Sequence, residues 1–484
     1  MKTYTRLMIA TMVAVALSAL AGAQSWTPLR HQPGTNVGPM LQLRDGRILV
    51  NESQNPDPGQ WFVLTPDARG SYVNGTWSSG GHLPAGYAPV YFGSQVLLDG
   101  KTVVIEGGEY NNGTAVWTTK GARLTYSGNT FTWVSNNPPT GWTTIGDAQS
   151  IILTNGRYLQ ANCCTTQSAF YCGPNCWTAN ANIVGTDNDE GAYTLLPNGK
   201  LLMVDAWSTA CSASFSSELY DPTHTSWSCG PDTPVQLWDN SGHELGPATL
   251  LHNGKVFYVG ATNATAIYNP STNSWSNGPV PPNHLTGYDA PAALEPTGKV
   301  LEMFGPTGFR TGCQFMEYNP MTGTLSNVPN PAHCPSDASY VGHLMILPSG
   351  QIMFTDFSGL VEVFTPSGSV DPLAKPTITS APSHLTAGSH NNVLHGTQLN
   401  GLSQNSTYGD DYQGDTNFPL IRLTNNTTGN VYWATTHNES THSIAPGTVM
   451  FTKFDVPAGV PNGTYRLNVV TSGVLSNTFM VSIP

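Results

Sequence analysis

The hydrophobic and polar positions of this chain repeat one pattern: an apolar run, a turn that contains glycine, and a second apolar run. In one copy, residues 192–196 are mostly apolar, residues 197–199 read Pro-Asn-Gly, and residues 201–204 are apolar again. An Asn-Gly pair supplies the positive φ that a tight hairpin turn requires. The pattern therefore predicts a β-hairpin at this position.

Seven copies of this hairpin follow one another along the chain. Their turn glycines lie 43 to 56 residues apart, within or near the period of propeller blades. Three copies end in a Trp-Ser pair, which indicates further strands after the hairpin. The repeats predict a seven-bladed kelch-type β-propeller over residues 24–370. The turn glycines are Gly46, Gly100, Gly156, Gly199, Gly254, Gly298 and Gly350.

The seventh repeat lacks its closing Trp-Ser strand and runs into Pro366 instead. The segment Ser25-Trp26-Thr27 resembles the end of a blade that has no beginning. We expect this amino-terminal segment to pair with the seventh blade, because pairing closes the ring and covers an exposed sheet edge.

The pattern changes over residues 376–484, where short alternating strands are separated by turn residues. Such a run of about seven strands is typical of an immunoglobulin-like sandwich. The sequence therefore predicts an all-β chain with two domains. The strands expected in the second domain are residues 420–424, 431–435, 450–456, 465–471 and 478–483.

Residues 1–23 carry the features of a signal peptide. Lys2 and Arg6 precede an apolar run from Leu7 to Leu20, and Ala21-Gly22-Ala23 fits the small residues before a cleavage site. The run is too short for a comfortable membrane span. We expect a protein that is secreted, either extracellular or periplasmic, and that has no membrane span.

The charge balance argues against nucleic acid as a partner. The formal net charge is −12, and it becomes −14 when Lys2 and Arg6 leave with the signal peptide. Phosphate binding needs clustered lysine and arginine, and no such cluster occurs in the sequence.

Eight cysteines behind a signal peptide indicate disulfides formed in an oxidising compartment. Cys211–Cys229 and Cys313–Cys334 are expected pairs, since each falls within one repeat. Three pairings remain open for the other four, which crowd the third repeat and are expected to staple a shortened or irregular blade. Zinc is a weaker alternative, because their spacing does not match paired zinc ligands. These four are Cys163, Cys164, Cys172 and Cys176.

The repeats and the carboxy-terminal motifs resemble the galactose oxidase and glyoxal oxidase superfamily, and most closely its secreted bacterial kelch-repeat proteins. The motifs are residues 396–403 (Gly-Thr-Gln-Leu-Asn-Gly-Leu-Ser), 408–411 (Tyr-Gly-Asp-Asp) and 417–422 (Asn-Phe-Pro-Leu-Ile-Arg). The resemblance implies one copper in the central channel of the propeller. Its ligands are two tyrosines, one of them cross-linked to a cysteine, and two histidines, one of which comes from the sandwich.

Only part of this ligand set is present. Tyr340 matches the axial tyrosine and His437, in Thr436-His437, matches the histidine of the sandwich. Val341 stands where the other histidine belongs, although His343 follows it on the same strand face. Tyr91 and Asp147 stand where the cysteine and its tyrosine belong. The sequence thus predicts that the copper-radical site is degraded, with His437 in the bore beside Tyr340 and with Asp147 and Asp289 near the same level.

The positions nine residues before the turn glycines hold three carboxylates: Asp147, Glu190 and Asp289, with Asp189 and Glu244 close by. Innermost strands line the channel, so these side chains are expected to converge at one mouth. They favour a hard cation such as Ca²⁺, and crowding raises a carboxyl pKa towards that of a general acid. The alternative is that they cap turns.

Residues 436–442 hold His437 and His442, which would tilt metal preference towards Zn²⁺ or Cu²⁺. Tryptophans in or near the connections can stack on sugar rings or can pack between blades. These are Trp61, Trp117, Trp142, Trp177, Trp207 and Trp238.

The sequence favours a secreted binding module for an extracellular glycan or protein. The alternative is a metal-dependent enzyme at the channel mouth, either an oxidase-like oxidoreductase or an acid/base lyase or hydrolase. Its candidate catalytic residues are Tyr340, Asp147, Glu190 and Asp289, and its candidate metal ligands are His437, Tyr340 and His442. The sequence assigns no particular cofactor, and Ca²⁺ or Cu²⁺ is the candidate divalent metal.

Overall fold

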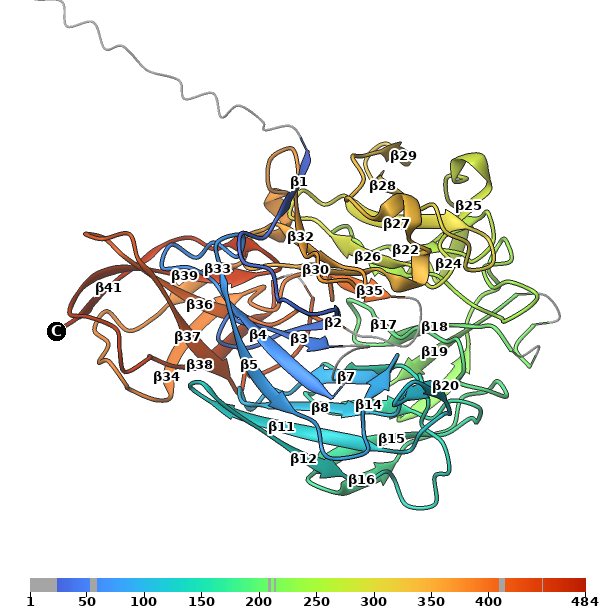
Figure 1. Cartoon of the computed structure of the whole chain (residues 1–484), viewed down its shortest axis with the longest axis horizontal. Helices are drawn as coiled ribbons and strands as arrows, with labels where there is room; N and C mark the ends of the chain where they lie inside the picture. The colour runs from blue at the N-terminus through green and yellow to red at the C-terminus, as the bar shows by residue number, and fades with distance from the viewer. Residues whose placement is uncertain (1–23, 53–58, 208–209, 213–214, 409–413, 446) are drawn as a thin grey trace, which may run out of the picture.

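The computed structural model describes residues 24–52, 59–207, 210–212, 215–408, 414–445 and 447–484. The predicted signal peptide, residues 1–23, lies outside these residues. The chain is all-β, with seven antiparallel sheets that form the blades of a propeller, followed by an immunoglobulin-like sandwich (Figure 1). This arrangement confirms the predicted fold class.

The first four blades run from the innermost to the outermost strand in chain order. They are β2 (Val37–Gln42), β3 (Ile48–Glu52), β4 (Gln60–Thr65) and β5 (Thr76–His82); β7 (Gly93–Val96), β8 (Thr102–Glu106), β11 (Gly121–Ser127) and β12 (Thr130–Asn136); β13 (Ser150–Ile152), β14 (Tyr158–Ala161), β15 (Ser168–Gly173) and β16 (Cys176–Ala179); and β17 (Thr194–Leu195), β18 (Leu201–Asp205), β19 (Ser216–Asp221) and β20 (Ser226–Cys229).

The last three blades follow the same order, except that β1 completes the seventh. They are β21 (Ala248–Leu250), β22 (Val256–Val259), β23 (Thr265–Asn269) and β24 (Ser274–Asn277); β26 (Pro291–Leu294), β27 (Val300–Pro306), β28 (Gln314–Asn319) and β29 (Thr324–Asn327); and β30 (His343–Ile346), β31 (Ile352–Thr355), β32 (Glu362–Thr365) and β1 (Ser25–Pro28).

Short elements decorate the connections between these strands. They are β6 (Pro89–Val90), β9 (Tyr110–Asn111) and β10 (Thr114–Ala115), which form a small sheet; β25 (Leu285–Thr286), which pairs with β27; and the 3₁₀ turns η1 (Pro282–His284), η2 (Cys334–Ser336), η3 (Ser339–Val341) and η4 (Pro372–Ala374).

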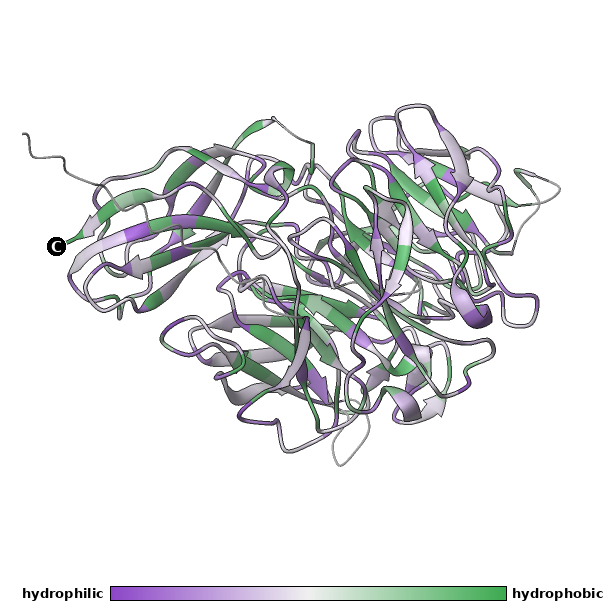
Figure 2. Ribbon diagram, turned by 90° about the horizontal axis from the view of Figure 1, so that it is seen from above, coloured by the Kyte–Doolittle hydropathy of each residue, from purple (hydrophilic) through white to green (hydrophobic). Residues whose placement is uncertain are grey.

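Burial explains why the sequence of each hairpin consists of two apolar runs. Every residue of β2, β3, β18 and β22 is buried, because the inner strands lie between neighbouring blades. The outermost strands β16, β24 and β29 are mostly exposed. Figure 2 shows hydrophobic residues concentrated in the blade strands and hydrophilic ones in the connections. All seven turn glycines have φ between 78° and 84°, as the hairpin turn requires.

The amino terminus closes the ring, as predicted. β1 pairs antiparallel with β32, with Trp26 opposite Phe364 (Figure 1). The Trp26 ring lies edge-on to Phe315, with 5.1 Å between centroids, and its indole N–H donates to the Pro329 carbonyl at 2.7 Å. The seventh blade thus takes its fourth strand from the start of the chain.

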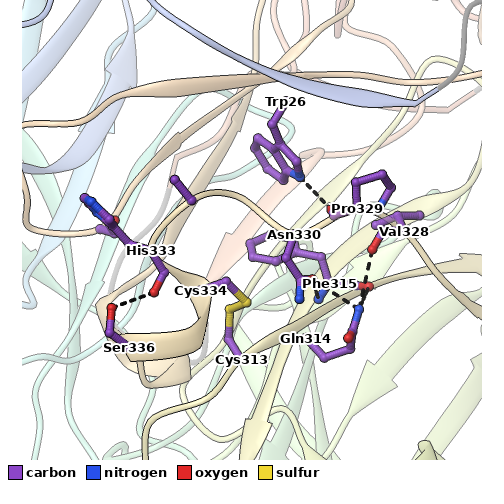
Figure 3. The surroundings of a disulfide bond; sticks show 12 residues. Trp26, Cys313, Gln314, Phe315, Val328, Pro329, Asn330, His333, Cys334 and Ser336 are labelled. Atoms are coloured by element: carbon purple, nitrogen blue, oxygen red, sulfur yellow. Dashed lines mark hydrogen bonds and ion pairs between the residues drawn. A yellow bond between two sulfur atoms is a disulfide. The ribbon is translucent and has the colours of Figure 1, made fainter.

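Three disulfides join cysteines within single blades. Cys313–Cys334 and Cys211–Cys229 confirm the two predicted pairs. Figure 3 shows that Cys313–Cys334 lies under Trp26 and Phe315, beside the closing strand. Cys172–Cys176 joins β15 to β16. The third blade has four strands and is therefore not shortened, but its strand pairing is irregular, as the alternative expected, with a register shift between Tyr171 and Gly173.

The sandwich is a curled sheet whose two halves enclose one core. Ile378, Phe454 and Leu467 are buried in this core. The five predicted strands are present within two residues at each end. The strands are β33 (Thr377–Ser380), β34 (Asn392–Thr397), β36 (Leu420–Asn425), β37 (Val431–His437), β38 (Val449–Asp455), β39 (Gly463–Thr471), β40 (Val474–Leu475) and β41 (Phe479–Ile483).

The sandwich docks on the turn ends of the inner hairpins. A side chain at Gly46 would meet the Trp433 ring at 2.8 Å, and one at Gly100 would meet the Thr436 carbonyl at 2.7 Å. Glycine is therefore needed at these turns for close approach as well as for φ. Buried Arg44 forms a two-pronged ion pair with Glu439 across this interface, both bonds at 2.9 Å.

No helix among the described residues is long and apolar enough to span a bilayer.

Candidate functional site

The end of the propeller opposite the sandwich holds the predicted carboxylates. Residues nine positions before a turn glycine lie at the far end of an inner strand from that turn. Tyr91, Glu190 and Asp289 share this register in blades 2, 4 and 6, and all three have a left-handed φ, at 52°, 56° and 44°. This conformation is uncommon outside glycine and concentrates at functional sites. We call this end of the propeller the mouth.

Three carboxylates meet at the mouth. Glu190, Glu244 and Asp289 each offer an oxygen, and these oxygens lie within 4.8 Å of one another. The structure therefore brings together two of the predicted residues, with Glu244 as the third. Three crowded carboxylates can share protons, hold a cation or accept hydrogen bonds from hydroxyl groups.

A capped turn positions Glu244. The Asp239 carboxylate accepts backbone N–H bonds from Ser241 at 2.7 Å and from Gly242 and Glu244 at 3.1 Å. His243, between them, takes a left-handed φ of 67°. Asp239 is thus a turn-capping carboxylate, whereas its neighbour Glu244 projects towards the cluster.

Burial and mutual repulsion raise the pKa values of the mouth carboxyls. Burial is the main cause of the raised pKa of Glu109, which reaches about 7, and the charge of Glu244 adds to it. Burial likewise raises the pKa of Glu244, although hydrogen bonds to Asp289 and Glu190 oppose this shift. The Glu109 carboxyl therefore exchanges its proton near neutral pH.

A second group lies beside the first and contains two thiols. Cys163, Cys164 and Asp189 each offer one ligand atom, and these atoms lie within 4.8 Å of one another. The Cys163 thiol donates to Asp189 Oδ1 at 2.9 Å. Asp147 lies close enough for its charge to raise the pKa of the Cys163 thiol, after the larger effects of Cys164 and burial. Asp147 therefore belongs with the thiols and not with the three-carboxylate group.

Exposed aromatic rings border both groups. Trp117 is 49% exposed, and its ring lies against Gly146, next to Asp147. Trp207 is 41% exposed and stacks on His243, with 3.8 Å between centroids. Phe309 is 41% exposed and packs edge-on against Tyr288 and Tyr340. Among the described residues, these are the three phenylalanine, tyrosine or tryptophan residues that are exposed rather than buried or half-buried.

The bore beneath the mouth is filled by a segment that follows β34. Strand β35 (Ser406–Tyr408) pairs with β26 and extends the sixth blade. Tyr408 stacks on Tyr91 and His343, and its hydroxyl donates to the Tyr340 carbonyl. Ser406 accepts a bond from Ile346 N–H of the seventh blade at 3.2 Å.

Polar side chains on either side of β35 also bind the blades, and we call residues 404–408 together with Asp415 the plug. Gln404 accepts a bond from Leu195 N–H at 2.7 Å and donates to Asp415 at 3.0 Å. Asp415 also accepts from Gln95 at 3.2 Å, and burial raises its pKa to about 7. The segment thus ties the sandwich to blades 2, 4, 6 and 7 from inside the ring.

The expectation that His437 lies in the bore beside Tyr340 is wrong. His437 Nε2 lies 3.1 Å from Asp455 Oδ1, and its Cβ lies against the turn at Gly100. That turn is at the opposite end of the inner strand from Tyr91, which stacks with Tyr408 near Tyr340. The sandwich enters the bore through residues 404–408 instead. We infer that β35 takes the space a histidine would need.

His437 lines a groove of about 840 Å³ between the domains, whereas His442 is buried in their interface. His442 Nδ1 lies 3.3 Å from Glu439, and Nε2 lies 3.1 Å from Asn417. Neither histidine belongs to a group of three ligand atoms within 4.8 Å in the part of the chain that the structure describes. A metal-binding role for either remains a prediction.

The side chains present do not fit a copper-radical centre. Tyr340 is at the mouth, but Val341 cannot ligate, and the neighbouring His343 is fully buried against Tyr408 and Phe357. Burial lowers the pKa of His343 to about 3. Neither Cys163 nor Cys164 lies at the register position of a cross-linked cysteine.

Sequence reasoning missed Glu109 and Phe309 at the mouth and Tyr408 in the bore beneath it. Glu109 and Phe309 lie in connections after a second blade strand, so the register of the first strand does not reach them. Tyr408 begins the motif of residues 408–411, which indicates a family resemblance but predicts no position in the bore. Of the six flagged tryptophans, Trp117 and Trp207 are at the mouth, whereas Trp61 is buried between Phe92 and Trp133.

Neither a family model nor a curated protein matches this sequence. Among solved structures, the chain is similar to a fungal alcohol oxidase of the AA5 family in complex with copper, at 13% identity and a TM-score of 0.54, covering 96% of this chain and 99% of that one. It is also similar to a streptogramin B lyase, at 12% identity and a TM-score of 0.47, covering 71% and 97%. The virginiamycin B lyase of Staphylococcus aureus gives 11% identity and a TM-score of 0.48, covering 71% and 99%. At these identities, the likeness to the alcohol oxidase shows a shared fold, and the two lyases carry no further argument.

Proposed function

We propose that this protein is a secreted binding module that holds an extracellular glycan at the propeller mouth. The observation that carries the proposal is the position of Trp117, Trp207 and Phe309. Each follows the second strand of an even-numbered blade, and each borders the mouth carboxylates. The three disulfides support export to an oxidising compartment.

The chemistry of the mouth suits a neutral or basic sugar. Exposed aromatic faces stack on the C–H faces of sugar rings, and carboxylates accept hydrogen bonds from hydroxyl groups. The clustered charges of Glu190, Glu244 and Asp289 repel carboxylated or sulfated sugars. Amino sugars gain an ion pair with the same groups.

Substituting Trp207→Ala or Trp117→Ala is expected to weaken glycan binding. Each loss of a stacked ring should cost about 0.5–1.5 kcal/mol, or roughly 2- to 13-fold in Kd. The measurement is calorimetric titration of the mature protein with neutral, amino and acidic oligosaccharides. Met321→Ala, which removes an exposed side chain in the sixth blade far from the mouth, is the matched control.

Two outcomes of that titration would overturn the proposal. One is the absence of binding to every oligosaccharide in the set. The other is binding whose Kd stays the same in both tryptophan variants, because that result would place the glycan elsewhere.

An acid/base enzyme is the second candidate, and the titration of Glu109 favours it. A carboxyl with a pKa of about 7 beside other carboxyl groups can protonate a leaving group. If the mouth is catalytic, bound oligosaccharides are cleaved and Glu109→Gln abolishes cleavage while binding persists. Cleavage that continues in Glu109→Gln would exclude this role.

Oxidase activity is not expected. Copper-loaded protein should release no hydrogen peroxide from galactose or glyoxal, because the side chains for a cross-linked tyrosine are missing. Peroxide release that depends on copper and is lost in His437→Ala would contradict this prediction. A commercial galactose oxidase assayed in parallel verifies the detection.

A further inference from the structure

Cys163 and Cys164 are adjacent thiols in a chain whose other six cysteines form disulfides. They follow β14 in the third blade and face the mouth near Asp189. The pairing of Cys172 with Cys176 leaves these two only each other among the cysteines of that blade.

The two thiols differ in access but share one neighbour. Cys163 is fully buried, whereas Cys164 is partly exposed. Their sulfur atoms and an oxygen of Asp189 all lie within 4.8 Å of one another, and the Cys163 thiol donates to Asp189 Oδ1 at 2.9 Å. The Cys164 thiol can therefore react with a solute, while the Cys163 thiol lies beside Asp189, which can accept its proton.

We propose that Cys163 and Cys164 form a reversible disulfide between adjacent residues on the wall of the mouth. Reversibility follows from the covalent geometry. Adjacent Cα atoms are about 3.8 Å apart across a trans peptide, below the usual disulfide range of about 4.4–6.8 Å. The other three bonds join Cα atoms 5.0 to 5.2 Å apart. The adjacent bond is therefore the most readily reduced of the four.

The reaction balances with a small-molecule disulfide as oxidant. The Cys164 thiol loses its proton to solvent, and the thiolate attacks one sulfur of the oxidant. A mixed disulfide forms, and the small thiolate that leaves takes up a proton to become one thiol. Cys163 then passes its proton to Asp189 and attacks the Cys164 sulfur, which releases the second thiol. Two protein thiols and one small disulfide become one protein disulfide and two small thiols.

A soft metal held by both thiols is the competing use of this group. Metal binding needs Cys163 to remain a thiolate. The hydrogen bond with Cys164, burial and the charges of Asp147 and Asp189 all raise the pKa of the Cys163 thiol and oppose that state. Disulfide formation needs the Cys163 thiolate only transiently, during the attack on the Cys164 sulfur, while Asp189 holds the proton.

Oxidation changes the mouth, and this consequence rests on the proposed function. The dithiol form donates a hydrogen bond to Asp189, and the disulfide form has no proton to donate. The Kd for a glycan should therefore differ between the two forms. Thiol titration does not depend on a glycan, so failure of the proposed function leaves the redox test intact.

The test is alkylation of the mature protein after denaturation, followed by mass spectrometry of the fragment that contains residues 163 and 164. After exposure to oxidised glutathione, we expect both alkylatable thiols to be lost and the fragment to be lighter by two hydrogens. Dithiothreitol should then restore both thiols at a concentration that leaves the other three disulfides closed.

Single variants separate the two sulfurs. Cys163→Ser should trap glutathione on exposed Cys164, whereas Cys164→Ser should leave buried Cys163 free of glutathione. Retention of both alkylatable thiols after oxidation would overturn the proposal. One bound zinc or copper per molecule that protects both thiols until a chelator is added would overturn it in favour of the metal.

Discussion

Deleting residues 24–30 from a chain that begins at Gln24 should destabilise the propeller by about 3–5 kcal/mol, the cost of removing a packed tryptophan. The deletion removes Trp26 from its contacts with Phe315, Phe354 and Phe364, and it removes buried Leu29. It also exposes the edge of β32, which then lacks a hydrogen-bonded partner. The measurement is the shift in the urea or thermal midpoint relative to residues 24–484.

Trp26→Phe is the matched control for this deletion. It keeps the strand pairing and most of the ring packing but loses the 2.7 Å bond to Pro329 (Figure 3). Its unfolding midpoint should therefore fall between those of the full chain and the deletion variant. A truncated chain that melts within about one degree of the full chain would contradict ring closure by β1.

Arg44→Ala should have a comparable effect, about 3–5 kcal/mol, because it leaves a buried charge unpaired. Arg44 and Glu439 are both fully buried, and the guanidinium also lies over the Phe418 ring, 4.5 Å from its centroid. Lys200→Ala, which breaks an ion pair with Asp221 between partly exposed side chains, is the control and should cost about 0–1 kcal/mol. Equal midpoints for the two variants would show that the interface pair contributes nothing.

The ion pair of Arg44 with Glu439 also makes the free energy of unfolding depend on pH in the acid range. Burial opposes ionisation of Glu439, but Arg44 and His442 outweigh it and hold the Glu439 pKa at about 2. A pKa lowered by folding adds stability that is fully present above the ordinary value of 4.5 and is lost as pH falls to about 2. In Glu439→Gln this part of the pH dependence should disappear.

The repeat and its closure could be predicted because both depend on local rules. Inner strands are buried on both faces, so they read as apolar runs, and the turns need glycine at Gly46 and its six equivalents. Trp26 could be assigned to the seventh blade because the Trp-Ser pattern was missing there.

The bore could not be predicted in the same way. Resemblance placed His437 in it, but docking of two domains depends on side-chain contacts that no local pattern encodes. Here Trp433 and Thr436 rest on the turns at Gly46 and Gly100, which leaves His437 outside the ring. Tyr408 enters because β35 adds a strand to the sixth blade, a pairing between residues far apart in sequence.

The closing strand also sets the order in which the fold can form. A ribosome makes the amino terminus first, and Ser25 pairs with Thr365. Strand β1 is therefore synthesised on the order of tens of seconds before its partner strand β32 at ordinary translation rates. The plug at Tyr408 emerges later still. Until β32 has been made, β1 has no partner strand and the ring is open there, and until Tyr408 has been made, the bore lacks β35. Protection from aggregation during synthesis therefore depends on what covers these unpaired strand edges.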